Sequence, residues 1–522
     1  MIDACRFALD CCERNIAQTY QPQAPDVHVM NLHVFAANKQ LGGRPIAPYI
    51  DEVGDQITGF TRSSALSGAI APLMDALCAN PKAVALEFCS HSRAETFGAA
   101  FIESAAKVCS DGVLRAALDA HASDEYRHGR MFRALAERLG ETFPTETEQP
   151  DEARFRADDA GAFTGNMGAF MCSTHVAEIR SLCLLGAFLE AARALPKTLK
   201  PRITSILERV HDDEMRHAEY SGDWVQRYLN ASEISPSYIA ECFAVYERDL
   251  WANLSTISAH LHQGWSTCTD DAEKLTETLG ARLLVTKALT EAAAETSPAL
   301  EAVLTAVERN HPALALAAYR AVEKCLIADT EAHSKTLFSD GDEERCGVGL
   351  IRTLRTHLPG LTQAEITQLD RHEADEIRHA HMYDSYACRL RGGRGVTGLE
   401  IDSLDPIDDL GPDFTPEHAG ELLLSLHLGE VHNLQRLRQR IMALEDGPVD
   451  QPWLIAGLKS IAADEVRHVA STATLLDRLL IAQPDLRNSI AIYARQYGGS
   501  WWSDIGVMTA ALSGESRARY SA

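Results

Sequence analysis

Four copies of one short motif place a glutamate and a histidine three residues apart. The motif is Asp-Glu-x-Arg-His, and its copies run from Asp124 to His128, from Asp213 to His217, from Asp375 to His379 and from Asp464 to His468. On an α-helix, residues three apart differ by about 60° in direction and about 4.5 Å in height, so both side chains can approach one ion. One copy could be a surface ion pair. Four copies in register predict metal binding.

The four motifs belong to an internal repeat. Glu125 and Glu376 are 251 positions apart, and so are Glu214 and Glu465, so the second half of the chain repeats the first. The similarity extends to residues 175–182 and 427–434, and residues 85–95 resemble residues 321–331. The last match pairs Glu95 with Glu331. It requires extra residues in the second half, which we place in a polar surface loop at 339–349.

Each half supplies four glutamates and two histidines on helical spacing. The predicted metal ligands are Glu95, Glu125, His128, Glu178, Glu214 and His217 in the first half, and Glu331, Glu376, His379, Glu430, Glu465 and His468 in the second. Four carboxylates and two imidazoles suit a pair of iron ions, with manganese as the alternative. Zinc usually takes a smaller set that is richer in cysteine or histidine.

The residues around these ligands predict supporting roles. An aspartate precedes each motif glutamate and can accept the remaining N–H of a ligand histidine, and an arginine lies between glutamate and histidine. These residues are Asp124, Asp213, Asp375, Asp464, Arg127, Arg216, Arg378 and Arg467. Four further histidines recur near the ligands in both halves, namely His121, His175, His372 and His427. They are candidates for extra ligands, although a core histidine satisfied by a hydrogen bond is the favoured interpretation.

The elements that must position these residues are helices. Apolar residues recur at intervals of three and four in the matched segments, and no convincing alternating strand is present, so we predict an all-α fold. The ligand helices are expected at about 80–228 and 310–482, with starts at Asn80-Pro81 and at residues 310–312. Residues 141–155 and 391–406 predict long crossover connections. We place the domains at 1–245 and 246–522, while a helix over 239–262 could bridge them.

Composition limits the remaining functions. The chain has 522 residues, of which 46% are hydrophobic and 24% charged, as in globular proteins. A net charge of −25 disfavours nucleic acids and anionic membranes as partners. We expect a cytoplasmic protein, because neither a signal peptide nor a long apolar stretch is present. The aromatic segment 493–506 is expected to pack on a helical bundle or at an oligomer interface, such as that of a homodimer.

The motifs resemble those of the ferritin-like superfamily. The sequence DEIRH at 375–379 is similar to the motif of bacterial multicomponent monooxygenases, and DEYRHG and DEMRHAEY are similar to motifs of soluble acyl-carrier-protein desaturases. The resemblance implies two tandem ferritin-like four-helix bundles, each with a di-iron centre that activates O2. It implies hydroxylation, N-oxygenation, desaturation or oxidative rearrangement of a small organic metabolite. Electrons would come from an external reductase or ferredoxin, because the chain has no flavin or iron–sulfur motif.

Two alternatives stay open. The chain could be a ferroxidase, a peroxidase or a metal-handling protein similar to ferritin or rubrerythrin. Alternatively, one bundle could be catalytic and the other structural. The sequence does not identify the substrate, because residues that line a pocket cannot be separated from core residues by pattern alone.

Overall fold

The fold was analysed in a computed structural model that describes residues 36–57, 66–141, 166–193, 195, 199–267, 303, 306, 313–393, 418–447 and 451–514. Within these residues the chain is helical apart from one short hairpin, formed by β1 (Gln40–Leu41) and β2 (Arg44–Pro45). The predicted all-α fold class is therefore confirmed. The predicted crossover connections lie almost entirely outside the described residues, and so does the predicted helix start at 310–312.

The chain divides into two compact units at Gly264 and Trp265. We call the described residues before this point the N-terminal unit and those after it the C-terminal unit. The predicted boundary at 245/246 falls inside one continuous helix, α10 (Pro236–Thr267), and the division lies near the end of that helix. Among the described residues no helix is sufficiently long and apolar to cross a membrane.

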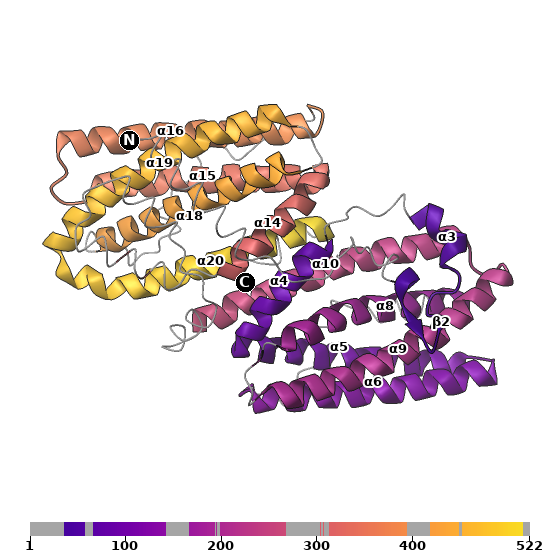
Figure 1. Cartoon of the computed structure of the whole chain (residues 1–522). Helices are drawn as coiled ribbons and strands as arrows, with labels where there is room; N and C mark the ends of the chain where they lie inside the picture. Colours follow the sequence, from indigo (N-terminus) through magenta and orange to yellow (C-terminus); the bar gives the residue numbers. More distant parts are fainter. Residues whose placement is uncertain are drawn as a thin grey trace. The chain divides into compact units, whose positions relative to one another are not determined.

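In the N-terminal unit, four long helices pack as two pairs. The helices α5 (Pro81–Val108) and α6 (Gly112–Arg138) form one pair, and α8 (Met167–Ala192) and α9 (Lys200–Asn230) form the other. Contacts between α6 and α9 join the pairs (Figure 1). The helix α4 (Leu66–Ala79) packs on α5 and α8, and the short α3 (Ile50–Ile57) precedes it.

The C-terminal unit repeats this arrangement. Its pairs are α15 (Thr330–His357) with α16 (Gln363–Leu390), and α18 (Ala419–Glu445) with α19 (Pro452–Ala482). The helix α14 (Ala313–Ala328) packs on α15 and α18, as α4 packs on α5 and α8. The short η3 (Pro484–Leu486) and α20 (Arg487–Ser513) complete the unit.

Side-chain caps mark where several of these helices begin. The predicted start at Asn80-Pro81 is confirmed, because Asn80 caps α5 and its side chain accepts a hydrogen bond from the Ala83 N–H at 3.1 Å. Asp329 caps α15 in the same way and lies 249 positions after Asn80. Thr362 and Glu365 form a reciprocal capping box at the start of α16. The caps show that α15 corresponds to α5, and that α14 corresponds to α4.

The predicted surface loop at 339–349 is wrong, because these residues lie in the middle of α15. Two of the polar side chains that suggested a loop are buried and paired: Asp340 accepts hydrogen bonds from two arginines of α18, and Arg345 pairs with Asp384 of α16. Gly347 serves close packing rather than a turn, since a Cβ atom there would lie 2.7 Å from Oε2 of Glu376. The two halves therefore need no inserted loop at this point.

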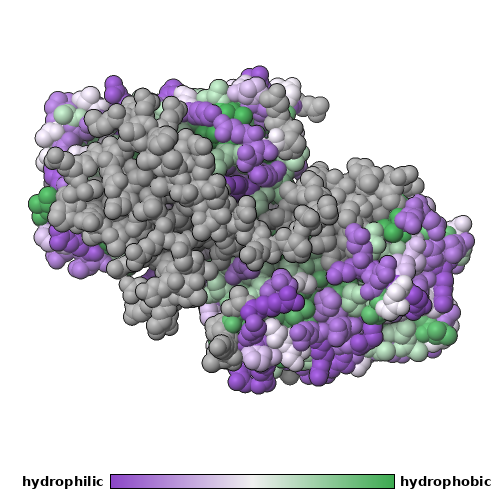
Figure 2. Space-filling model, viewed as in Figure 1, coloured by the Kyte–Doolittle hydropathy of each residue, from purple (hydrophilic) through white to green (hydrophobic). Residues whose placement is uncertain are grey.

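The repeat also includes α10 and α20, a pair of equivalent helices that was not recognised from the sequence. At a shift of 251 positions, α10 matches α20, and Tyr246 and Trp251 correspond to Tyr497 and Trp502. The aromatic segment 493–506 is part of α20 and packs within its own unit, where Trp501 and Trp502 are buried and Trp501 contacts Tyr319 edge to face. On the face shown in Figure 2, hydrophilic residues cover much of the described surface, with hydrophobic residues scattered among them.

Candidate metal centres

The N-terminal unit brings seven predicted residues together in its interior. Two groups of buried side chains could each hold a metal ion, namely Glu95, Glu125, His128 and Glu214, and His121, Glu125, Glu178 and His217. Glu125 belongs to both groups. We call the seven residues together the N-terminal centre. They come from α5, α6, α8 and α9, so all four long helices of the unit contribute to one site.

Two glutamates connect the two groups of the N-terminal centre. One carboxylate oxygen of Glu214 lies 3.2 Å from Nδ1 of His128, and the other lies 3.2 Å from Nδ1 of His217. Oε1 of Glu125 lies 3.2 Å from Nδ1 of His217 and 3.1 Å from Nε2 of His121. The distances show that both carboxylates lie between the histidines. Such carboxylates can bridge two cations.

The C-terminal unit forms an equivalent site. Its two groups are Glu344, Glu376, His379 and Glu465, and His372, Glu376, Glu430 and His468. We call these residues the C-terminal centre. The two oxygens of Glu465 each lie 3.2 Å from a histidine, one from Nδ1 of His379 and the other from Nδ1 of His468. Glu465 and Glu376 therefore occupy the positions that Glu214 and Glu125 occupy in the first unit.

The structure does not place the predicted ligand Glu331 in the C-terminal centre. The structure places Glu344, not Glu331, in the C-terminal centre, at 3.4 Å from Nδ1 of His379. The side chain of Glu331 is 49% exposed in the first turn of α15 and pairs with Lys335 and Arg391. The error arose because residues of α14 were aligned with residues of α5. Glu344 lies 249 positions after Glu95, the same shift that relates the two helix caps.

The four additional histidines divide into two pairs. His121 and His372 lie in the centres. Nε2 of His121 is 3.2 Å from the carboxylate of Glu178 on α8, and Nε2 of His372 is 3.1 Å from that of Glu430 on α18. The favoured interpretation was a core histidine. The structure instead places these two histidines among the candidate ligands.

His175 and His427 lie outside the candidate groups. Each is buried, and its Nδ1 lies 2.9 Å from a hydroxyl, that of Ser221 for His175 and that of Thr472 for His427. Burial lowers the pKa of His175 to about 3 and that of His427 to about 4, so both imidazoles are neutral core side chains.

The predicted aspartates and arginines lie directly behind the ligand histidines. Asp213 lies 3.0 Å from Nε2 of His128, and Asp124 lies 3.4 Å from Nε2 of His217. Asp464 and Asp375 contact His379 and His468 in the same way, each at 3.4 Å. The arginines form ion pairs with these aspartates, as Arg127, Arg216, Arg378 and Arg467 all show. Each histidine can therefore offer Nδ1 to a metal while Nε2–H donates to an aspartate.

The charges of both centres suit a cation. Burial and the nearby Glu214 carboxylate raise the pKa of Glu178 to about 8, and burial and the nearby Glu344 raise the pKa of Glu376 to about 8. Among the described residues, several buried atoms that could bind a cation have charged neighbours but no hydrogen-bond partner of good geometry, including Nδ1 of His128, Nδ1 of His379 and Oε1 of Glu465. Atoms of this kind are costly to bury unless something pairs with them. A metal ion would satisfy them.

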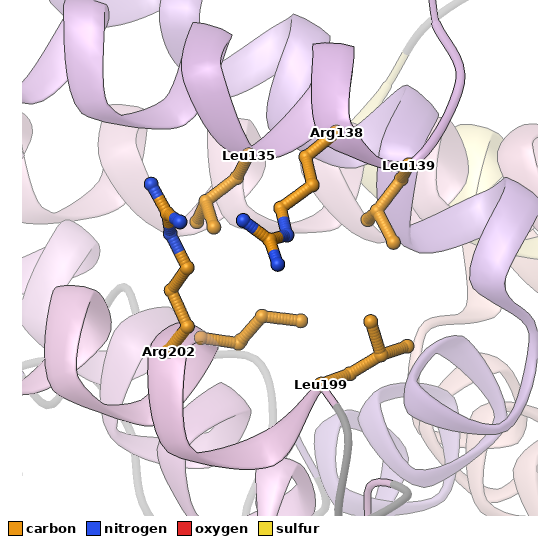
Figure 3. A pocket seen from close by; sticks show the side chains of 6 residues that line it. Leu135, Arg138, Leu139, Leu199 and Arg202 are labelled. Carbon is orange, nitrogen blue, oxygen red and sulfur yellow. The ribbon is translucent and has the colours of Figure 1, made fainter.

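A surface pocket lies apart from both centres. It is lined by Leu135, Arg138, Leu139, Leu199, Arg202 and Ile203, at the end of α6 and the start of α9 (Figure 3). None of these residues belongs to a candidate ligand group.

Comparison of the chain with family models, with curated proteins and with solved structures gave no match.

Proposed function

We propose that the chain is a ferritin-like di-iron carboxylate enzyme with a four-helix bundle in each unit and a pair of irons in each bundle. The observation that carries the proposal is the sharing of Glu125 between two candidate ion positions, together with the sharing of Glu376 in the other unit. Four glutamates per centre offset about four positive charges, which is the charge of two divalent ions.

The donor set favours iron. Each centre offers four carboxylates and three imidazoles and no thiolate, whereas structural zinc sites are usually tetrahedral and closed by four ligands. Manganese accepts a similar set and is the closest competitor. The aspartates behind His128, His217, His379 and His468 hold each imidazole in one orientation, so the protein, rather than the ion, fixes where the donor atoms lie.

We propose that the reaction is O2-dependent oxidation of a small organic molecule. The carboxylates and imidazoles of each centre would hold the irons in a buried site, and bound reduced iron would supply the electrons for O2 activation. Each of the seven residues of the N-terminal centre is 8% exposed or less, which limits the access of water to the reacting groups. Because the sequence contains no flavin or iron–sulfur motif, an external reductase or ferredoxin completes the electron supply.

Anaerobic loading with Fe(II) followed by exposure to O2 tests this proposal. We expect about four irons per chain, a transient visible absorption after O2 is added, and faster O2 consumption when the correct organic substrate is present. Protein that binds no iron, or bound iron that does not react with O2, contradicts the proposal. Consumption of Fe(II) or H2O2 without an organic substrate would instead indicate a ferroxidase or peroxidase.

Two variants separate the units. Glu125→Ala removes a shared carboxylate from the N-terminal centre, and Glu376→Ala does so in the C-terminal centre. We expect each variant to lose about half of the iron. Activity that survives one substitution and not the other identifies the catalytic unit.

A further inference from the structure

The N-terminal centre has a tyrosine, Tyr220, whose hydroxyl contacts a candidate ligand. The oxygen of Tyr220 lies 2.6 Å from Nδ1 of His121, and the two rings meet edge to face at 5.7 Å between centroids. The other ring nitrogen of His121, Nε2, faces Glu125 and Glu178 in the N-terminal centre. One imidazole therefore joins Tyr220 to a candidate ion position.

The equivalent contact is missing from the C-terminal centre. The residue 251 positions after Tyr220 is Ser471, whose hydroxyl donates to the backbone oxygen of His468 at 3.0 Å. His372 corresponds to His121 and stacks on His468 at 3.7 Å, as His121 stacks on His217 at 3.7 Å. Among the described residues, however, Nδ1 of His372 has no hydrogen-bond partner. The two imidazoles therefore have equivalent stacking partners but differ in the hydrogen bond at Nδ1.

A cation held by Nε2 of His121 would leave the ring proton on Nδ1, where the Tyr220 oxygen can accept it in a hydrogen bond. A neutral imidazole has one N–H and one lone pair. When Nδ1–H of His121 donates to the Tyr220 oxygen, the lone pair lies on Nε2 and points toward Glu125 and Glu178. Among the described residues, Nδ1 of His372 has no such acceptor. Partners of this kind typically change metal affinity by about 10- to 100-fold.

We infer that the two centres are not equivalent, and that Tyr220 is a positioning residue that makes the ion position formed by His121, Glu125, Glu178 and His217 bind its metal more tightly than the position formed by His372, Glu376, Glu430 and His468. The N-terminal centre therefore fills first at limiting metal. The inference rests on the metal-binding part of the proposed function, and it does not depend on any reaction with O2.

Anaerobic titration of the full chain with Co(II) tests the inference. The centres are compared by silencing one at a time, with Glu376→Ala or with Glu125→Ala, and by following heat and visible absorption. We expect the affinity of the His121 position to exceed that of the His372 position by about 10- to 100-fold. Equal affinities, or tighter binding at the His372 position, would overturn the inference without any Tyr220 variant.

The Tyr220→Phe variant tests the residue itself. In the Glu376→Ala background, we expect it to weaken binding at the His121 position by about 10- to 100-fold and to leave the position formed by Glu95 and His128 largely unchanged. The matched control is Tyr246→Phe, which removes a hydroxyl that bonds Ser173 at 2.7 Å and contacts no candidate ligand. Unchanged Co(II) binding in Tyr220→Phe, or equal weakening at both positions, would overturn the assignment.

The tautomer of His121 gives a second readout that a merely structural role would not change. In the parent chain loaded with Zn(II), the 15N chemical shifts of the two His121 ring nitrogens should show a hydrogen-bonded proton on Nδ1 and a metal on Nε2. In Tyr220→Phe we expect the Nδ1 proton to lose its hydrogen bond and to exchange faster with water. A Zn(II)-loaded parent chain in which Nε2 of His121 keeps its proton would contradict the inference.

Discussion

Asp213 on α9 lies 3.0 Å from Nε2 of His128 on α6, so the aspartate of one motif supports the histidine of the other. The relationship is reciprocal, because Asp124 on α6 contacts His217 on α9. The same exchange occurs between α16 and α19 in the C-terminal unit. It explains why the motif contains an aspartate beside the glutamate: each helix supplies candidate ligands to the site, and its aspartate contacts a histidine of the facing helix.

Asp213→Asn should weaken metal binding in the N-terminal centre. The amide keeps the shape of the side chain but removes the charge that orients His128, so we expect an affinity loss of about 10- to 100-fold. Competition of a metal chelator with the protein measures the change. The control is Asp212→Asn at the neighbouring exposed position. An equal loss in both variants would show that the effect is not specific to the His128 contact.

Glu344→Ala and Glu331→Ala distinguish the candidate ligand that the structure places in the C-terminal centre from the one predicted from sequence. Glu344 is buried beside His379, whereas Glu331 is half-exposed and pairs with Lys335 and Arg391 at the surface. We expect Glu344→Ala to lower the metal content of the C-terminal centre and Glu331→Ala to leave it unchanged, as metal analysis of the purified chains would show. Metal loss in Glu331→Ala alone would support the original alignment.

These two glutamates show which ligands can be predicted from the sequence and which cannot. Within each of the four motifs, the glutamate and the histidine lie on one turn of the same helix, so local spacing was sufficient to predict them. The partner of Glu95 required an alignment across a helix boundary, and the only local mark of that boundary is the cap at Asp329. The run 339–349 contains glycines and charges that usually indicate a loop. Its burial comes from partners on α16 and α18, which no local pattern shows.

The two additional histidine pairs illustrate a second limit. His121 and His175 both recur near ligands in the other half, so the sequence assigned them the same role. The structure separates them, because Nε2 of His121 faces two carboxylates and Nδ1 of His175 contacts Ser221 in the core. Whether a histidine binds a metal or fills a core depends on the facing helices, and their rotation is set by packing rather than by local spacing.

Gly347→Ala should disturb the C-terminal centre more than the fold. A Cβ atom at residue 347 would lie 2.7 Å from Oε2 of Glu376, closer than packed atoms allow, so the shared carboxylate must move. The matched control is Gly98→Ala at the equivalent position of α5, where a Cβ atom would have no neighbour within 4 Å. We expect weaker metal binding in Gly347→Ala and unchanged metal binding in Gly98→Ala, as measured by metal titration. Equal binding in both would show that Glu376 can shift without cost.

Asp340→Ala should destabilise the C-terminal unit strongly. Asp340 is buried and accepts hydrogen bonds from Arg436 and Arg440, so its loss leaves the buried Arg440 and the largely buried Arg436 with less compensation. We expect a loss of about 3–5 kcal/mol in the free energy of unfolding, measured with denaturant. The fold itself does not require these charges, because the position equivalent to Arg440 is Phe188, which stacks on Phe88.

Glu343→Ala is the control for Asp340→Ala. Glu343 also pairs with Arg436, but its side chain is 50% exposed. Solvent screens such a pair, and we expect its removal to cost about 0–1 kcal/mol. Similar losses in the two variants would contradict the assignment of Asp340 as the central acceptor of the cluster.

Glu87 predicts an acid-dependent loss of stability in the N-terminal unit. Its carboxylate lies 2.9 Å from Nδ1 of His260 on α10 and 3.2 Å from Nε2 of His91 on α5. Burial opposes ionisation, but the hydrogen bonds from His260 and His91 outweigh it and lower the pKa of Glu87 to about 2. Because the pKa is lower in the folded chain, the ionised carboxylate stabilises the fold above the unfolded pKa of about 4.3, and this contribution is lost as the pH falls toward 2.

Glu87→Gln should therefore flatten the pH dependence of stability between about pH 4 and pH 2. The lost contribution at neutral pH is on the order of 3 kcal/mol, from a pKa difference of about two units. Denaturant unfolding of the metal-free chain at several pH values measures it. Glu103→Gln on the same helix is the control, because Glu103 is 44% exposed and pairs only with Lys107 among the ion pairs that the described residues show. If the stability of Glu87→Gln falls with acid as steeply as that of the parent chain, the two histidines do not hold the carboxylate in its ionised form.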